Sequence, residues 1–483
     1  MSAEGSEGAP RPETAVGLSL IAGALVEEPA PGRLSVRTPP EVHRAPVTMD
    51  GIAPGLAEVL RALQGDGGAT QASLAARALQ SAGFGGLGLL QRFVGLLDRG
   101  ALLSRSLLVD GVRVASIHPL SVYYRWSESG IDTERSYRLS RFACCRRDER
   151  GLLVESPLGH AQVRLEAGPA VQALGALAEP RTTAELAAQV GGLGEEGAQL
   201  FMGFLANGGA LEACGPGEAG PEAQDPRLAL WDFHDLLFHT RSRLGRHSNA
   251  YGGTYRFKEL FEPLPAQKPA AGDSVPLPAP DLARLAVEDR PFSAVLESRR
   301  SKREYAERAL SLAQLGEFLY RAARVQKAVP EGSVSFRPHP AGGALHELEI
   351  YPVVRTCEGL PAGLYHYDAF GHRLERLAEP SRAVEALLQM AAATAQIEAP
   401  PQVLFVITAR FQRIQWKYQS MSYALILKNV GALYQTMYLV ATAMGLAPTA
   451  LGGGHSDLFA AAAGLDYLAE TSVGEFILGS ARV

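Results

Sequence analysis

The stretch Pro401-Gln-Val-Leu-Phe-Val-Ile-Thr408 decides the fold class of the C-terminal half of this chain. Its short, unbroken apolar run is typical of a strand that is buried on both faces of a sheet. A long helix is expected from about Ser420 to Met444, with Gly445 in the position that ends a helix. Further strands are expected at 348–354 and 472–478. Strands and helices mixed in this way predict an α+β domain.

The composition of the 483 residues excludes several classes of protein. With 46 Lys and Arg against 51 Asp and Glu, the net charge is −5, so there is no overall basic field to hold nucleic acid or an anionic membrane. Four cysteines are too few for a disulfide framework, and none forms a CxxC pair that could start a metal site. We therefore expect a cytoplasmic protein that binds no metal, no nucleic acid and no membrane.

One uncharged run, Asn429 to Ser456, is long enough to cross a membrane, but polar side chains and a Gly452-Gly453-Gly454 break interrupt it. The run from Thr14 to Val26 is too short to span a bilayer and is expected to pack locally or form an early strand. We expect the longer run to include a helix that is buried in a large core or a subunit interface. The interface alternative would make the chain a homodimer.

Two segments rich in Pro, Gly and Ala, at 215–226 and 263–280, divide the chain. They lack apolar periodicity, so we expect extended spacers. The predicted organisation is an N-terminal extension at 1–45, two similar modules at 46–130 and 131–214, a linker with a bridging helix at 215–280, and a C-terminal domain at 281–483.

The two N-terminal modules share a repeated pattern. Helical stripes begin at Phe93 in the first module and at Phe201 in the second, and a Gly stops each of them. Three helices followed by a strand pair that turns at Asp110-Gly111 predict a winged-helix plan, present twice. DNA binding is disfavoured, because the helices before the Gly stops carry few cations. Two alternatives stay open: the modules are packing scaffolds, or an exposed sheet edge captures an extended peptide.

Three elements of the C-terminal domain have the composition of a binding site. The segment 299–303, Arg-Arg-Ser-Lys-Arg, suits a terminal phosphate, because guanidinium groups and a hydroxyl can bond its oxygens. Gly342 and Gly343, ahead of a strand, permit the close approach of a flat ligand. Backbone N–H groups in the turn 452–454 can hydrogen-bond a ring nitrogen or stabilise anionic charge.

These elements resemble the nitroreductase-fold FMN dehydrogenases, and in particular the thiazole/oxazole-forming peptide dehydrogenases, or azoline oxidases, that mature ribosomally made peptides. The bridging segments 231–243 and 251–255 are also similar to that family. The resemblance implies a nitroreductase-like, FMN-binding C-terminal domain. It covers about half of the chain, and the tandem winged-helix half only by architecture. The residues that carry it are Arg299–Tyr305, Pro340–Gly343, Gly363–Asp368, Trp416-Lys417-Tyr418, and Gly445-Leu446 with Gly452-Gly453.

The resemblance also implies roles for individual residues. Lys417 and Tyr418 are the implied catalytic pair, which handles the substrate proton. At Ala432 relatives often carry His, and at Thr436 they often carry Asn, so polar contacts from this helix are not implied. The implied FMN ligands are Arg299, Ser301 and Arg303 for the phosphate and ribityl chain, Ala341, Gly342 and Gly343 approaching the cofactor, Gly452 and Gly453 beside the flavin edge near N5, and Arg482 as a further phosphate candidate.

Conversion of a thiazoline or oxazoline to an aromatic azole removes one hydrogen as a proton and another as hydride. It therefore needs a base, either Lys417 or Tyr418, and a two-electron acceptor, FMN. The implied partners are an azoline-containing precursor peptide and a cyclodehydratase. Two alternative functions stay open: a small-molecule nitro or quinone reductase, and a flavin-free adaptor that presents peptides.

Overall fold

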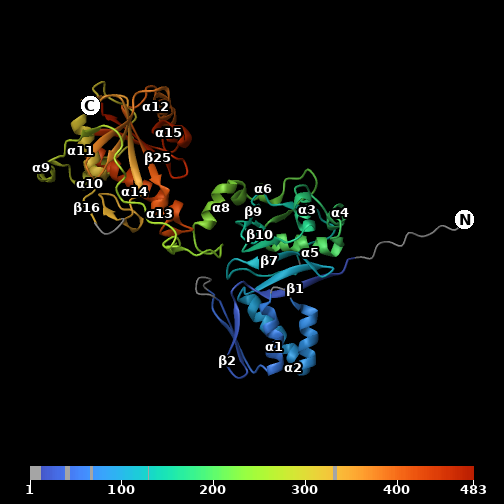
Figure 1. The fold of residues 1–483 in the computed structure, drawn as a ribbon. Helices are drawn as coiled ribbons and strands as arrows, with labels where there is room; N and C mark the ends of the chain where they lie inside the picture. The colour runs from blue at the N-terminus through green and yellow to red at the C-terminus, as the bar shows by residue number, and fades with distance from the viewer. Residues whose placement is uncertain (1–11, 39–43, 66–68, 129, 330–333, 483) are drawn as a thin grey trace. The chain divides into compact units, whose positions relative to one another are not determined.

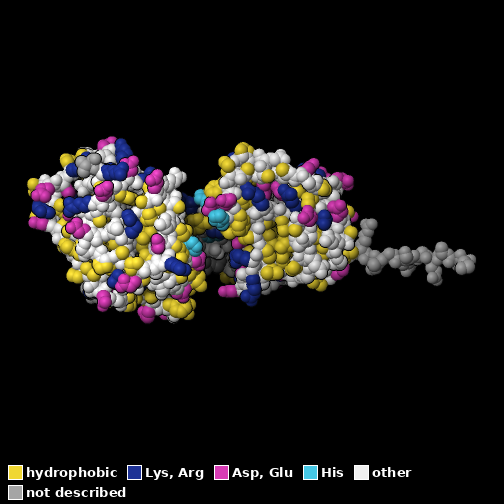
Figure 2. Space-filling model, turned by 90° about the horizontal axis from the view of Figure 1, so that it is seen from above, with side chains coloured by type: hydrophobic (Ala, Val, Ile, Leu, Met, Phe, Trp, Pro, Cys, Tyr) yellow, Lys and Arg dark blue, Asp and Glu magenta, His cyan; other side chains and the backbone are white. Residues whose placement is uncertain are grey.

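The computed structural model describes residues 12–38, 44–65, 69–128, 130–329 and 334–482 (Figure 1). The chain divides into two compact units, unit 1 ending at Ala250 and unit 2 beginning at Tyr251. On the face shown in Figure 2, Lys and Arg side chains are interspersed with Asp and Glu over each unit. None of the helices in the described ranges combines the length and the hydropathy that crossing a bilayer requires.

Unit 1 is built on a seven-stranded antiparallel sheet in the order β5-β1-β6-β7-β11-β10-β9. Residues 14–37, expected to lie in an N-terminal extension, form three strands, and β1 pairs along its whole length with β6. The elements of the first half are β1 (Thr14–Leu20), β2 (Leu25–Ala30), β3 (Arg33–Arg37), β4 (Val47–Asp50), α1 (Pro54–Arg61), the 3-10 helix η2 (Ala62–Gln64), β5 (Ala69–Thr70), α2 (Gln71–Arg99), β6 (Leu103–Val109) and β7 (Val112–Pro119).

The second half of unit 1 adds the other strands of this sheet, a separate two-stranded sheet of β8 and β12, and six helices. The elements are β8 (Tyr137–Leu139), β9 (Cys144–Asp148), β10 (Gly151–Glu155), β11 (Ala161–Leu165), α3 (Gly168–Ala176), α4 (Thr183–Gln189), α5 (Gly194–Asn207), β12 (Leu211–Ala213), α6 (Pro221–Gln224), α7 (Pro226–Ala229) and α8 (Phe233–Arg241).

The repeat predicted from the sequence is present, but the two halves of unit 1 differ. Phe93 and Phe201 are both fully buried, and their helices α2 and α5 end at Gly residues. In the first half, α2 is kinked at Gly83, so three helical pieces precede the β6–β7 hairpin, which turns at Asp110-Gly111 as predicted. In the second half the strand pair β10–β11 precedes the helices, and α5 leads only to β12. The second half therefore departs from the predicted winged-helix order, and the winged-helix identity of the first module stays a prediction.

Unit 2 is a mixed α+β domain, as predicted, with a seven-stranded antiparallel sheet in the order β14-β21-β20-β18-β22-β25-β24. Its elements are β13 (Gly252–Gly253), β14 (Ser274–Pro276), α9 (Leu282–Glu288), α10 (Phe292–Ser298), β15 (Leu310–Ser311), α11 (Leu312–Ala323), β16 (Lys327–Ala328), β17 (Ser335–Phe336), η3 (Gly342–Ala344), β18 (Leu348–Val354), β19 (Cys357–Glu358), β20 (Gly363–Asp368), β21 (Arg373–Ala378), α12 (Arg382–Ala395), β22 (Val403–Arg410), α13 (Phe411–Gln415), β23 (Tyr418–Gln419), α14 (Ser422–Ala443), β24 (Leu446–Leu451), α15 (Ser456–Ala463) and β25 (Glu470–Ser480).

Helices cover both faces of this sheet. Phe476 and Ile477 are neighbours in β25 and therefore face opposite sides. Phe476 belongs to a core cluster with residues of α11 and α14, whereas Ile477 belongs to a cluster with residues of α12 and α15. All eight residues of β22 are buried, so the prediction of a strand covered on both faces is confirmed. The predicted long helix is α14, and Gly445 follows it with φ +68°.

The segment 263–280, expected to be a spacer, is extended but is bonded to unit 2. Arg413 donates to the carbonyl of Leu264, and Arg410 donates to that of Ala266. The residues 274–276 form β14, the edge strand that pairs with β21. Backbone groups of this segment therefore belong to the domain, although its composition is that of a linker.

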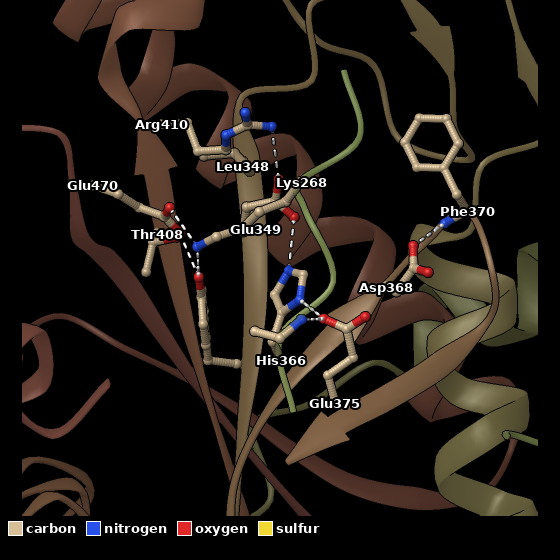
Figure 3. A network of polar contacts seen from close by, with 12 residues as sticks. Lys268, Leu348, Glu349, His366, Asp368, Phe370, Glu375, Thr408, Arg410 and Glu470 are labelled. Atoms are coloured by element: carbon tan, nitrogen blue, oxygen red, sulfur yellow. Dashed lines mark hydrogen bonds and ion pairs between the residues drawn. The ribbon is translucent and has the colours of Figure 1, made fainter. Parts of the chain in front are cut away.

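Lys268 fastens this segment to a buried polar network between the strands (Figure 3). Its Nζ lies 2.7 Å from the Glu470 carboxylate and 2.5 Å from the Tyr351 hydroxyl. The same carboxylate accepts hydrogen bonds from the Tyr351 and Thr408 hydroxyls. The network therefore compensates the charge of a carboxylate that the sheet takes away from water.

His366 holds a second part of the network, between two carboxylates (Figure 3). Its ring nitrogens lie 3.2 Å from Glu349 and 3.1 Å from Glu375, and Arg410 lies 3.4 Å from Glu349. Burial alone would lower the pKa of His366, but the hydrogen bonds and charges of the carboxylates outweigh it and raise the pKa. The imidazolium form therefore neutralises acids at the centre of the sheet.

We predict that Lys268→Met destabilises unit 2, because it leaves the buried Glu470 carboxylate without its cation. The expected loss is about 3 kcal/mol of unfolding free energy, which lowers the melting temperature by about 6–12 °C in a unit of this size. Thermal unfolding followed by circular dichroism measures it. Lys258→Met, at an exposed position of unit 2 just ahead of this segment, is the matched control and should change stability by less than about 0.5 kcal/mol. Equal melting temperatures for both variants would contradict the role given to Lys268.

Candidate functional site

Lys417 and Tyr418 follow α13, and their side chains converge on one glycine. A Cβ atom at Gly343 would lie 2.7 Å from the Tyr418 hydroxyl and 2.8 Å from the Lys417 Nζ. Gly343 also has φ +63°, a conformation that favours glycine. The structure therefore brings together two groups that the sequence predicted separately: the Lys-Tyr pair and the glycine loop 341–343.

A segment near the start of unit 2, residues 252–261, contacts this pair, and we call it the strap. In it, β13 pairs with β23, so that Gly253 lies opposite Tyr418. The Tyr255 N–H donates to the Lys417 carbonyl, and the Tyr255 ring lies 5.6 Å from the Lys417 Nζ. Tyr255 also meets Trp416 edge to face at 5.6 Å, and the Trp416 ring N–H donates to the carbonyl of Phe261. The strap therefore positions the Lys417 side chain against an aromatic face.

Side chains of α14 support the glycine loop 341–343. The Gly342 N–H donates to Asn429 Oδ1 at 3.1 Å, and Asn429 Nδ2 donates to Glu347 at 2.8 Å. Burial raises the pKa of Glu347, and its other carboxyl oxygen is buried without a partner in the described part of the chain. Leu425 completes the support, at 3.4 Å from a Cβ built on Gly342.

The cationic segment 299–303 runs along β24. The Lys302 N–H donates to the carbonyl of Pro448, and the Thr449 hydroxyl donates to that of Lys302. From α14, Tyr438 contacts the segment, with its hydroxyl 2.8 Å from the Ser301 hydroxyl and its ring 5.2 Å from the Arg299 guanidinium. Ser301 and Arg303 remain exposed, so this cluster is open to an anion from solvent.

Arg482 lies near the same segment. The backbone of Ala481 bridges to Tyr305, and Arg482 forms a long ion pair of 3.9 Å with the exposed Glu304. Such an exposed pair is weak, so the guanidinium stays available for an anion. The four predicted phosphate ligands therefore lie on the 299–305 segment and on the chain end beside it.

β24 leads from this cluster into the turn 452–454 and a cavity of about 430 Å³, which we call the Gly-turn cavity. A Cβ at Gly452 or Gly453 would meet no atom within 4 Å, so this backbone borders open space. Burial raises the pKa of Glu475, which also lines the cavity, to about 7. The cavity is lined by Tyr423, Leu427, Val430, Gly431, Tyr434, Leu451, Gly452, Gly453, Gly454, Ser456, Ser472, Val473, Gly474 and Glu475.

The helix α14 separates the predicted site residues into two groups. Leu425 and Asn429 contact the glycine loop beside Lys417, whereas Tyr434 lines the Gly-turn cavity and Tyr438 contacts the cationic segment. Leu425 and Tyr434 are nine residues apart, as are Asn429 and Tyr438, which is about two and a half helical turns. Within one chain, the two groups therefore lie on opposite flanks of α14.

Sequence reasoning missed four residues of this region. Asn429 was noted only as a polar interruption of an apolar run, and Glu347, Tyr255 and Glu475 were not singled out. A charge within the apolar closing strand, Val473-Gly-Glu-Phe-Ile-Leu478, was the available signal for Glu475. Tyr255 lies in the segment 251–255 that is similar to the family, but the similarity assigned it no role, and Glu347 gave no local signal. The contacts of both residues join distant parts of the chain.

A larger cavity, of about 820 Å³, lies in unit 1 and contains none of the predicted site residues. Arg113, Arg150 and Arg164 line it, but Arg113 pairs with Glu166 and Arg164 pairs with Asp148. We therefore place the chemistry in unit 2. Among the described residues, no group of three or more His, Cys, Asp or Glu side chains is arranged to hold a metal ion.

Comparison with known families agrees with this division of the chain. The family model "Nitroreductase family" matches residues 296–480, which lie in unit 2. The family model "Cyanobactin oxidase ThcOx" matches residues 137–248, which lie in unit 1. The two matches do not overlap, so each unit carries its own family signature.

A protein of Methanocaldococcus jannaschii named as a nitroreductase is 30% identical over 181 residues, which are 38% of this chain and 85% of that protein. The microcin B17-processing protein of Escherichia coli is 29% identical over 135 residues, covering 27% of this chain and about half of that protein, 48%. A solved nitroreductase of Exiguobacterium sibiricum in complex with FMN is 15% identical, with a TM-score of 0.29, over 40% of this chain and 90% of that one. Nitroreductases among the structural neighbours thus bind FMN.

The relative from M. jannaschii decides the family, because the identity extends over most of its length. The match to the cyanobactin oxidase model and the similarity to a peptide-processing protein point to one branch of that family. The chain therefore belongs to the nitroreductase family, as an oxidase with a cyanobactin oxidase region ahead of its nitroreductase domain.

Proposed function

We propose that this protein oxidises thiazolines or oxazolines in a ribosomally made precursor peptide to thiazoles or oxazoles, with FMN as its cofactor. The observation that carries the proposal is the convergence of Lys417 Nζ and Tyr418 OH over Gly343. A proton acceptor is what azoline oxidation requires in addition to a flavin. The cyanobactin oxidase match and the microcin-processing relative support a peptide substrate.

The chain's residues fit FMN. Arg299, Ser301, Arg303 and Arg482 offer three guanidinium groups and a hydroxyl for the phosphate. The open backbone at Gly452 and Gly453 suits the flavin edge, and the loop 341–343 suits close approach to a flat ring. When bound, FMN supplies the two-electron acceptor that takes the hydride.

Lys417 and Tyr418 handle the proton in this proposal. Both polar ends point at the same position over Gly343, so either can reach a C–H bond placed there. The strap residue Tyr255 orients the Lys417 side chain, and Gly343 leaves the space that a side chain would close. To accept a proton, the pair must first release one of its own protons to solvent; the group that has lost it then takes the substrate proton, while the other donates a hydrogen bond to that group.

We also propose that the active form is a homodimer. The Lys-Tyr pair and the phosphate cluster lie on opposite flanks of α14 in one chain, so a second copy is needed to bring one group of each kind to the same ligand. Closed twofold symmetry is the commonest way to do this, and it completes two sites at once.

The module at 131–214 is our candidate for recruiting the precursor peptide, together with the cyclodehydratase that makes the azolines. The cyanobactin oxidase match overlaps this module and extends through α8. Capture of a peptide by an exposed sheet edge raises the local concentration of its azolines near Lys417. All four cysteines are free thiols, in agreement with a reducing, cytoplasmic setting.

We predict that the purified protein is yellow and that, with oxygen, it removes two mass units from each azoline ring of a precursor peptide. Mass spectrometry of the peptide measures the loss directly. A small-molecule nitro or quinone reductase is the competing function, and it shares the flavin residues but not the need for Lys417-Tyr418. Reduction of a nitroarene by NAD(P)H without any peptide oxidation would support that alternative and contradict the proposal.

We predict that Lys417→Ala and Tyr418→Phe retain FMN but lower the rate of azoline oxidation by about 10²–10⁴-fold each, the usual contribution of a positioned acid or base. Single-turnover oxidation, with FMN content measured by absorbance, separates the two properties. Lys428→Ala, an exposed lysine on α14, is the matched control and should oxidise at the parent rate. Parent-like rates in both site variants would make the pair structural.

We predict that a full-length precursor has a KM at least about tenfold lower than that of a short azoline peptide without its leader, at a similar kcat, because tethering acts on binding and not on chemistry. Steady-state kinetics of the full-length enzyme on the two substrates measures both constants. Equal KM values would show that the N-terminal modules are packing scaffolds.

A further inference from the structure

Glu475 is a buried acid at the edge of the Gly-turn cavity that the proposed mechanism does not use. It lies on β25 opposite Leu451 of β24, and the residue is 6% exposed. Its backbone N–H donates to the Tyr434 hydroxyl at 2.6 Å. Its carboxyl oxygens have no hydrogen bond or ion pair to any residue that the structure describes. These oxygens are not among the fully buried atoms without a partner, so they face the cavity, where a ligand or a water can bond them.

The turn is shaped around this carboxyl. A Cβ at Gly454 would lie 1.7 Å from Glu475 Oε1 and 2.2 Å from its Cδ, so the carboxyl occupies the space that a side chain at 454 needs. Gly452 and Gly453, by contrast, face open space. The third glycine of the turn therefore admits Glu475, while the first two expose the backbone to the cavity.

The carboxyl is a hydrogen-bond donor at neutral pH. Burial is the one cause that raises its pKa, to about 7, so the protonated form is well populated. The titratable and charged groups on the elements packed around it are Tyr423, Lys428, Tyr434 and Tyr438 on α14, Glu470 on β25, and His455 and Asp457 at the start of α15. None of them forms an ion pair with Glu475 among the described residues, and burial is the one cause of its shifted pKa. An O–H group without a partner is costly in such a place, and a ligand with an acceptor atom removes that cost.

We propose that the Glu475 carboxyl donates a hydrogen bond to an acceptor atom on the edge of the flavin, beside Gly452 and Gly453. The inference rests on the FMN site proposed above, and it adds a ligand that the resemblance to azoline oxidases did not supply. One site contains the Glu475 carboxyl, the turn 452–454 and the Gly-turn cavity that both of them line. An electron-rich ring edge is the chemistry that a neutral carboxyl recognises, and the open space at Gly452 and Gly453 lets a flat ring approach it.

The consequence is a pH-dependent affinity. If the ligand binds only the protonated carboxyl, affinity is complete below the pKa and is lost as pH rises through it. Relative to pH 6, the Kd of the apoprotein should rise about twofold at pH 7 and about tenfold at pH 8. Riboflavin is the probe, because it lacks the phosphate and so isolates the ring contact; quenching of its fluorescence reports the Kd.

Glu475→Gln keeps a donor and removes the titration, so its riboflavin Kd should be flat from pH 6 to 8.5. Glu385→Gln, an exposed acid on α12, is the matched control and should follow the parent curve. Superimposable curves for the parent and Glu475→Gln overturn the inference. If Glu475→Gln does not fold, a parent Kd that stays constant over this range overturns it as well.

The outcomes separate this inference from the proposed function. A parent protein that binds neither riboflavin nor FMN at any pH contradicts the FMN site itself. Flavin binding without the pH dependence contradicts only the role of Glu475. If flavin affinity is flat but the KM for the azoline peptide rises above pH 7 in the parent alone, the acceptor lies on the peptide, and the flavin contact is wrong.

Discussion

The geometry of one helix governs the arrangement of the candidate site. α14 carries Leu425 and Asn429 on one flank and Tyr434 and Tyr438 on the other, about half a turn of the helix apart. The glycine loop with the Lys-Tyr pair contacts the first flank, and the Gly-turn cavity and the cationic segment contact the second. An α-helix with its side chains is about 10–12 Å thick, so neither group can reach past it. The proposed dimer is a consequence of this constraint.

The sheet under α14 contains charges that the fold neutralises locally. Lys268, His366 and Arg410 lie among the carboxylates of Glu470, Glu349 and Glu375, so that each buried acid has a partner. Glu475 differs, because burial raises its pKa towards neutrality and no described residue forms an ion pair with it. This contrast between paired acids in the sheet and an unpaired acid at the cavity is what marks Glu475 as a group that meets a ligand.

Local rules predicted much of unit 2 from the sequence. The unbroken apolar run forms β22, and Gly445 ends the long helix, as predicted. Composition gave a wrong prediction for the segment 263–280, which was expected to be a spacer. It has no apolar pattern, yet hydrogen bonds to its backbone attach it to unit 2. Tyr255, Asn429 and Glu347 could not be predicted, because their roles arise from contacts between segments that are distant in the chain. The division of the site by α14 could not be predicted either, because it depends on which residue of the helix makes each contact.

The most direct test of the account is complementation between two defective chains. Lys417→Ala and Arg303→Ala each inactivate one group, and mixed dimers contain one site in which both groups are intact if each site uses two chains. Co-expression in equal amounts should then restore about a quarter of the parent azoline oxidation, since half of the dimers are mixed and half of their sites are complete. Mixed dimers that stay as inactive as the separate variants would show that both groups act within one chain, and would contradict the account.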